Sequence, residues 1–159
     1  MSLRMFIHGL DSSNQGTKSV FFKEHYPAMI IPYFTGNLQE RMAKLEEILS
    51  DTSGITFVGS SFGGLMASLF AMQYESMVDR LILLAPAIDR IRESPYGIRK
   101  IWVPVHIYHG IHDDVIPLED VEREAKKLFH HLTFNIVDDD HFLHRTFKSM
   151  DWDMLLPDV

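Results

Sequence analysis

The sequence predicts an α/β fold built on a mostly parallel sheet with helices on both of its faces. Short apolar segments alternate along the chain with longer segments whose apolar residues recur at helical spacing. This alternation is typical of a parallel sheet that helices cover on both sides. The 159 residues, 46% hydrophobic and 23% charged, have the composition of an ordinary soluble globular protein and can bury a sizeable core.

Six segments have the short, apolar and β-branched or aromatic character of buried strands. They are residues 4–9, 28–34, 54–60, 80–87, 103–110 and 132–138. We therefore expect about six parallel strands.

Three helices are expected between these strands. Apolar residues recur at helical spacing through residues 38–49 and 118–128. In 118–128 the acidic residues come early and the lysines late, as the helix dipole favours. Residues 62–75 predict a third helix, whose small residues would allow a close approach to the sheet.

The whole chain, residues 1–159, is predicted to form one domain, because it holds no internal repeat, low-complexity tract or linker. Its last segment, 151–159, is expected either to dock through Trp152, Leu155 and Leu156 or to fray.

Charge and residue usage exclude several classes of function. A net charge of −7 without a basic stripe argues against a nucleic-acid partner. The absence of cysteine excludes disulfides, thiol catalysis and thiolate metal sites. No apolar run is long enough to span a membrane, and residues 1–4 lead into a strand rather than a signal peptide. We expect a cytoplasmic protein without a membrane partner.

A glycine–serine motif, Gly-Ser-Ser-Phe-Gly, occupies residues 59–63. It fits the G-x-S-x-G pattern of a nucleophile elbow when it is read from Ser61, which has Gly59 and Gly63 two positions away, and not from Ser60. The glycines are needed because the serine adopts an unfavourable backbone conformation and its neighbours pass too close for a β-carbon. Taken alone, the motif is also compatible with a glycine-rich helix start that has no chemistry.

Polar loops follow four of the predicted strands, at residues 8–13, 60–64, 110–117 and 138–143. Ligands of an open parallel sheet gather outside the carboxyl ends of its strands. These loops supply a serine, an aspartate and a histidine in that chain order, which one class of serine hydrolases uses. The acidic run 138–140 is expected to be a solvated part of the last loop.

The order of the loops assigns a role to each residue. Ser61 would be the nucleophile, and it needs a base to take its proton. His141 is the favoured base, with His144 as the alternative. Asp113 would orient the imidazole, and it is favoured over Asp114, which is left free to face solvent.

The chain resembles the α/β-hydrolases, and most closely the small lidless bacterial esterases and thioesterases of the YqiA kind. The resemblance lies in "HGLDSSNQGTK" (8–18), "GSSFGG" (59–64), "LAPA" (84–87) and "DHFL" (140–143), and it spans about residues 4–145. The acid loop matches the wider superfamily pattern G-x-x-D-x-V-I-P. The resemblance implies a minimal α/β-hydrolase fold that lacks the family's first two strands.

An oxyanion hole is expected from two backbone N–H groups. Phe62 follows the nucleophile, and the resemblance of "HGL" to the family's His-Gly-x turn implicates Leu10. Substrate contacts are expected from Leu10, Phe62, Ile111 and Phe142. Residues 88–102 leave room for one short helix rather than a cap domain.

No metal or cofactor is expected. His106, His109 and His112 are spaced three apart, and on a strand such residues face opposite sides and cannot converge on one ion.

The sequence therefore predicts a serine carboxylesterase or thioesterase that cleaves small acyl esters through an acyl-enzyme on Ser61. Two alternatives stay open. The same groups could serve an amide or peptide hydrolase or an acyltransferase, or the chain could be a non-catalytic binding module that keeps the fold.

Overall fold

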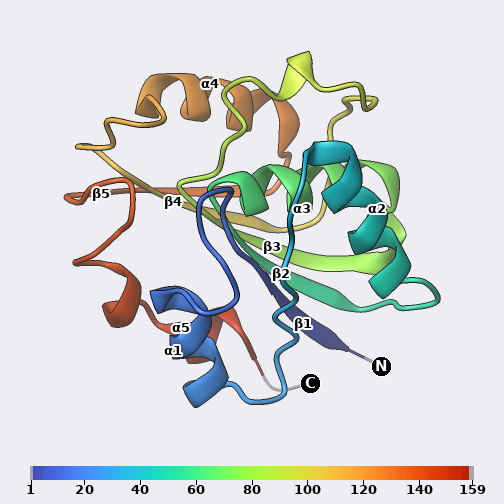
Figure 1. Ribbon diagram of the computed structural model, residues 1–159. Coiled ribbons are helices and arrows are strands. Elements are labelled where there is room, and N and C mark those ends of the chain that lie inside the picture. The colour runs from blue at the N-terminus through green and yellow to red at the C-terminus, as the bar shows by residue number, and fades with distance from the viewer. Residues whose placement is uncertain (1, 158–159) are drawn as a thin grey trace.

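A single five-stranded parallel sheet forms the centre of the molecule, whose computed structural model describes residues 2–157 (Figure 1). The strands are β1 (Leu3–Ile7), β2 (Ile55–Ser60), β3 (Val78–Leu84), β4 (Val105–Gly110) and β5 (Leu132–Val137). They are ordered β1-β2-β3-β4-β5, and every neighbouring pair is parallel. All the carboxyl ends therefore lie at one edge of the sheet.

Helices cover both faces of this sheet (Figure 1). They are α1 (Thr17–His25), α2 (Leu38–Ile48), α3 (Phe62–Gln73), α4 (Leu118–Leu128) and α5 (Trp152–Leu155), with short 3-10 turns at Glu75–Met77, Ile91–Glu93 and Phe147–Ser149. The predicted helices over 38–49, 62–75 and 118–128 are confirmed as α2, α3 and α4. In Figure 1, α2, α3 and α4 lie on one side of the sheet and α1 and α5 on the other.

The predicted strand over 28–34 is not a strand. Only Ile30 pairs with β1: its N–H donates to the Arg4 carbonyl at 2.9 Å, and its carbonyl accepts from the Phe6 N–H at 3.0 Å. In a parallel ladder the next donor toward β1 would be residue 32, which is a proline and has no N–H. The ladder stops there, and five strands form instead of six.

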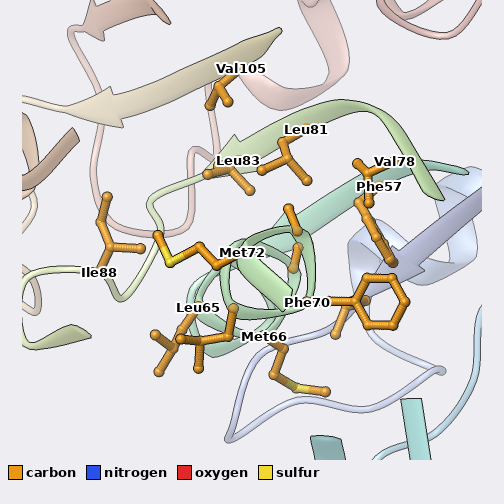
Figure 2. Packing of buried hydrophobic residues seen from close by; sticks show 14 of the residues in the cluster. Phe57, Leu65, Met66, Phe70, Met72, Val78, Leu81, Leu83, Ile88 and Val105 are labelled. Atoms are coloured by element: carbon orange, nitrogen blue, oxygen red, sulfur yellow. The ribbon is translucent and has the colours of Figure 1, made fainter. Parts of the chain in front are cut away.

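Alternation along the strands builds two apolar cores. Figure 2 shows Leu81 and Leu83 of β3 pointing toward α3, and both belong to the cluster between the sheet and α2, α3 and α4. Ile82 and Leu84, one position out of phase, belong to the cluster on the opposite face with Phe22 of α1. Alternate residues of a strand face opposite sides of the sheet, so each strand supplies side chains to both cores. Burying each such side chain contributes about 1.5–3 kcal/mol.

The chain's last segment docks rather than frays as far as it is described. Trp152, Leu155 and Leu156 are buried in the α1-side core. The Trp152 indole N–H donates to the Phe147 carbonyl at 2.9 Å. Residues 158–159 of the predicted tail lie outside the described residues. Across residues 2–157, no helix combines the length and apolarity needed to cross a bilayer.

Residues 88–102, where a cap would be inserted, hold only the 3-10 turn Ile91–Glu93. Ile88, Ile91 and Ile101 are fully buried in the core on the α3 side. Their burial anchors the segment to the body of the fold instead of leaving it free above the sheet edge.

Candidate active site

Ser61 lies in the turn between β2 and α3, with φ 53° and ψ −114°. A positive φ is costly for a residue with a β-carbon, and such strain persists only when the surrounding structure imposes it. The Ser61 N–H donates to the Leu84 carbonyl of β3 at 2.9 Å, and its carbonyl accepts from the Ala87 N–H at 2.9 Å. Neighbouring segments thus hold the strained serine in place, as expected of a nucleophile elbow.

The two glycines of the motif are required by close packing. A β-carbon on Gly59 would lie 2.5 Å from the Gly63 carbonyl oxygen, and one on Gly63 would lie 2.0 Å from the Ile7 carbonyl oxygen. Both distances are shorter than any tolerable contact, and the atoms in the way are backbone. Any side chain at either position would push α3 away from β1 and β2.

His141 stands between Ser61 and Asp113. Its Nε2 lies 3.2 Å from the Ser61 Oγ, and its Nδ1 lies 2.7 Å from the Asp113 Oδ2. A carboxylate only accepts hydrogen bonds, so Nδ1 carries the hydrogen and Nε2 is left to accept from the serine hydroxyl. The structure therefore brings together three residues in an unbroken series of hydrogen-bond donors and acceptors. Ser61 and Asp113 are 52 positions apart in the sequence, and Asp113 and His141 are 28 apart.

The Asp113 carboxylate is fully buried and saturated with donors. Its Oδ1 accepts from the backbone N–H groups of Val115 at 2.9 Å and Ile116 at 2.8 Å. Burial alone would raise the pKa of Asp113, but the hydrogen bonds from His141, Ile116 and Val115 outweigh burial and hold the pKa below its ordinary value. The Asp113 carboxyl group therefore keeps its negative charge to lower pH than an ordinary aspartate does.

The three alternative residues lie elsewhere in the hydrogen-bond pattern. His144 is exposed, and its Nδ1 pairs with the Asp140 carboxylate at 2.6 Å. Asp114 is exposed beside the buried Asp113 side chain. Ser60 is the last residue of β2, and His141 bonds its neighbour Ser61 instead.

The acidic run before His141 is not a solvated loop throughout, because Asp139 is buried. Its Oδ2 accepts from the backbone N–H groups of Arg145 at 2.9 Å and Thr146 at 2.7 Å, and its Oδ1 accepts from the Asp140 N–H. Burial would raise the pKa of Asp139, but hydrogen bonds from the Thr146 side chain and from these backbone groups outweigh it and lower the pKa. Asp139 thus ties together the turn that carries His141, a role that no sequence pattern distinguished from those of its acidic neighbours.

The two expected oxyanion donors flank Ser61. Neither the Leu10 nor the Phe62 N–H donates a hydrogen bond within residues 2–157, and Phe62 is the first residue of α3, where the helix dipole adds to its donor strength. A β-carbon built on Gly9 would lie 3.5 Å from the Ser61 β-carbon, which places the Gly9–Leu10 turn directly beside the serine.

His8 fixes the orientation of that turn. The Phe34 N–H donates to its Nε2 at 2.9 Å, so Nδ1 carries the hydrogen and donates to the Gly9 carbonyl at 2.8 Å. Because the peptide is planar and trans, a Gly9 carbonyl held toward His8 points the Leu10 N–H the opposite way. Sequence reasoning missed the contact with Phe34, which lies 26 residues further on.

Burial, followed by repulsion from Arg41 and Lys44, lowers the pKa of His8 below its ordinary value of 6.5, against the effect of the Gly9 carbonyl. The folded state therefore binds fewer protons here than the unfolded state, so stability from this group is complete above about pH 6.5 and is lost as the pH falls. We expect the Tm measured by circular dichroism between pH 7.5 and pH 5 to fall less steeply for His8→Gln, which keeps an acceptor for Phe34 but does not titrate. Parallel Tm curves for the two proteins would contradict this assignment.

A cavity of about 790 Å³ opens beside Ser61 and His141, within the size range of small-molecule sites. Three of the four expected substrate-contact residues, Leu10, Phe62 and Phe142, line it. Ile111 does not line it: the residue follows β4 and is 51% exposed. The acid loop contributes the side chain of Val115 instead.

Further apolar walls come from residues that the sequence did not single out as substrate contacts. They are Phe6 of β1 and Leu143 and Phe147 of the segment after His141. Lys18 joins two walls, since its ammonium donates to the Phe142 carbonyl at 2.8 Å. Burial lowers the pKa of Lys18, and Asp140 and Asp139 oppose that shift.

The three spaced histidines do not meet. His112 pairs with the Asp138 carboxylate at 2.8 Å, whereas His109 is buried and faces Asp113. Within residues 2–157, no group of three or more His, Cys, Asp or Glu side chains could hold a metal ion.

Comparison with known proteins identifies a family whose model matches this chain. The family model described as alpha/beta hydrolase fold matches residues 12–100, more than half of the chain. No curated protein matches the sequence of this chain.

Solved structures share the fold at low sequence identity. A protein of Xanthomonas campestris pv. campestris described as a hydrolase of the alpha/beta superfamily is 24% identical with a TM-score of 0.75, over 94% of this chain and 93% of that one. Mouse alpha/beta hydrolase domain-containing protein 10 is 18% identical with a TM-score of 0.75, over 92% and 83%. Est1E of Butyrivibrio proteoclasticus with bound ferulic acid is 17% identical with a TM-score of 0.71, over 92% and 84%. On the family match, the elbow turn and this shared fold, the chain belongs to the α/β-hydrolase family.

Proposed function

We propose that this protein is a serine hydrolase, a carboxylesterase or thioesterase, that cleaves small acyl esters through an acyl-enzyme on Ser61. The observation that carries the proposal is the continuous hydrogen-bonded chain from the Ser61 hydroxyl through His141 to the buried Asp113 carboxylate. An activated serine needs a base within hydrogen-bond reach and a third group that orients the base. Ser61 and the proposed base His141 line the same cavity, and the proposed orienting group, Asp113, is buried behind His141.

The reaction follows from these atoms. The Ser61 Oγ attacks the carbonyl carbon of the ester as its proton passes to the His141 Nε2, and the new oxyanion is held by the N–H groups of Leu10 and Phe62. The imidazolium then gives this proton to the departing alkoxide or thiolate, which leaves the acyl group on the serine. In the second half, His141 takes a proton from water as the water oxygen attacks the acyl carbon. The bond from that carbon to the Ser61 Oγ then breaks, the imidazolium returns the proton to the Ser61 Oγ, and the acid is released.

Ester cleavage is favoured over the alternatives by two considerations. Alkoxide and thiolate leave the tetrahedral intermediate more readily than an unprotonated amide nitrogen, so esters and thioesters make a smaller demand on the general acid. Among the structurally similar proteins, one is a monoacylglycerol lipase of Paleococcus ferrophilus and another, Est1E, binds ferulic acid. Amide or peptide cleavage and acyl transfer use the same three residues and would be distinguished by a panel of esters, thioesters and amides.

A fluorophosphonate probe tests the proposal directly, because it phosphonylates only an activated serine. We expect the folded protein to be labelled on Ser61, with the adduct located by peptide mass spectrometry. His141→Ala should label far more slowly, since the hydroxyl then has no base. A folded protein that is not labelled would favour the non-catalytic binding module.

Acyl-chain preference should reflect the missing cap. Leu10 and Phe142 line the cavity but are 51% and 57% exposed, so a long chain beyond them would remain in water. Each buried methylene contributes about 0.8 kcal/mol, so kcat/KM for p-nitrophenyl esters should rise over roughly the first two to six acyl carbons and then level off. We expect no increase at the micelle threshold. A steady rise to long-chain esters would mean that part of the chain folds over the site as a cover.

A further inference from the structure

A buried histidine that the proposed reaction does not use contacts the acid of the site. His109 is near the end of β4 and is fully buried. Its Nε2 lies 3.2 Å from the Asp113 Oδ2, the oxygen that also accepts from His141, and 2.9 Å from the Ile116 carbonyl oxygen. One imidazole nitrogen therefore faces both the carboxylate and the backbone of the loop that carries it.

The partners of Nε2 determine the tautomer of His109. A carbonyl and a carboxylate can only accept, so Nε2 carries the hydrogen and shares it between the Ile116 oxygen and the Asp113 Oδ2. The Nδ1 atom is buried without a hydrogen-bond partner among residues 2–157. Burying an unpaired polar atom costs free energy, so an apolar side chain would serve packing alone better at this position.

We propose that His109 is a positioning residue that acts through Asp113 and fixes the direction in which its carboxylate faces His141. The inference rests on the proposed function, in which Asp113 orients the base. Backbone N–H groups hold Oδ1, and on the Oδ2 side His109 is the one donor besides His141 itself within residues 2–157. Without it, the Oδ2 atom keeps only its bond with His141, so small tilts of the carboxylate are less restrained and the imidazole is less precisely aligned with Ser61.

The surroundings of His109 make it a rigid support. The next residue, Gly110, has no room for a β-carbon, which would lie 2.2 Å from the Asp139 carbonyl oxygen. The end of β4 is therefore packed against the segment that leads to His141. A side chain on this strand end is well placed to set the acid and histidine loops relative to each other, as supporting groups of a precise site must be.

Two substitutions separate the donor from the volume. His109→Phe keeps a planar ring but removes the donor, whereas His109→Gln places an amide N–H near the position of the imidazole Nε2. We expect His109→Phe to lower kcat for p-nitrophenyl acetate about tenfold with little change in KM, because a hydrogen bond to a charged group is lost that acts on orientation and not on binding. His109→Gln should recover most of the lost kcat.

A double-variant cycle tests whether the effect passes through Asp113. In an Asp113→Asn background, His109→Phe should cost little further activity, because the group on which it acts is already lost. Equal losses in the Phe and Gln variants, or full additivity with Asp113→Asn, would overturn the positioning role and leave a packing role.

A readout without substrate makes the inference independent of the reaction. The His141 Nδ1–H proton that bridges to Asp113 should give a downfield ¹H NMR resonance in the folded wild-type protein and in His109→Gln. In His109→Phe this resonance should shift or broaden, while the amide spectrum stays folded. An unchanged resonance would reject the inference even in an active enzyme, whereas wild-type protein without Ser61-dependent hydrolysis would reject the proposed function alone.

Discussion

Ser61→Ala should lower kcat for ester hydrolysis by about four to six powers of ten, the loss expected when the nucleophile of such a triad is removed. The hydroxyl donates to the His141 Nε2 at 3.2 Å, so alanine removes the proposed attacking oxygen and leaves the base without its partner. Alanine keeps the β-carbon, so the strained backbone at φ 53° is retained and the fold should survive. Initial rates with p-nitrophenyl acetate, together with a thermal melt of each variant, measure both effects.

Ser60→Ala is the matched control. Ser60 also lines the cavity, but the His141 Nε2 bonds Ser61 and not Ser60, so this variant should keep most of the wild-type kcat. A result in which Ser60→Ala abolished hydrolysis and Ser61→Ala did not would mean that the elbow had been read from the wrong serine. Retained hydrolysis in both variants would place the nucleophile outside this motif.

Local demands of the backbone explain why so much of the site could be predicted. Gly59 and Gly63 are required because a β-carbon at either position would lie less than 3 Å from neighbouring backbone atoms, and such close packing leaves a signature in the sequence itself. The order of the loops predicts a common edge, because parallel strands place their carboxyl ends together. The hydrogen bonds that join His141 with Ser61 and with Asp113 agree with that prediction.

The sequence predictions and the structure differ in several places. Residues 28–34 have strand composition, but Pro32 lacks the one N–H that would continue the ladder with β1. Helix α1 was not predicted, because its apolar residues 20–22 are consecutive and show no helical period. The Ile111 side chain was expected near the substrate. In the structure it does not line the cavity and is 51% exposed.

Contacts between distant segments were not visible in the sequence at all. The bond from the Phe34 N–H to His8 joins residues 26 positions apart, and the buried Asp139 differs from its acidic neighbours only in its folded surroundings. His8 and Asp139 support the geometry of the site through these contacts and not through a hydrogen bond to Ser61. Motifs identify the groups that react, whereas the groups that orient them are selected by packing.

Asp113→Asn should lower kcat by about four powers of ten, far more than Asp114→Asn. The backbone N–H groups of Val115 and Ile116 will keep the amide oxygen at the place of Oδ1, so the amide NH₂ is forced toward His141. Facing a donor, the imidazole must present a bare Nδ1 and carry its hydrogen on Nε2, where it can no longer accept the proton of Ser61. The wrong tautomer, more than the lost charge, removes the base.

The exposed Asp114 makes the comparison decisive, because Asp114→Asn removes the same charge one residue away without entering the hydrogen-bond chain. We expect its kcat to stay within about threefold of wild type, as for other surface charges. Adding Ser61→Ala to Asp113→Asn should cost far less than the sum of the single losses, because the three residues act as one unit. Small and equal losses from the two aspartate variants would place the orienting acid elsewhere in the chain, and the inference about His109 would fail with it.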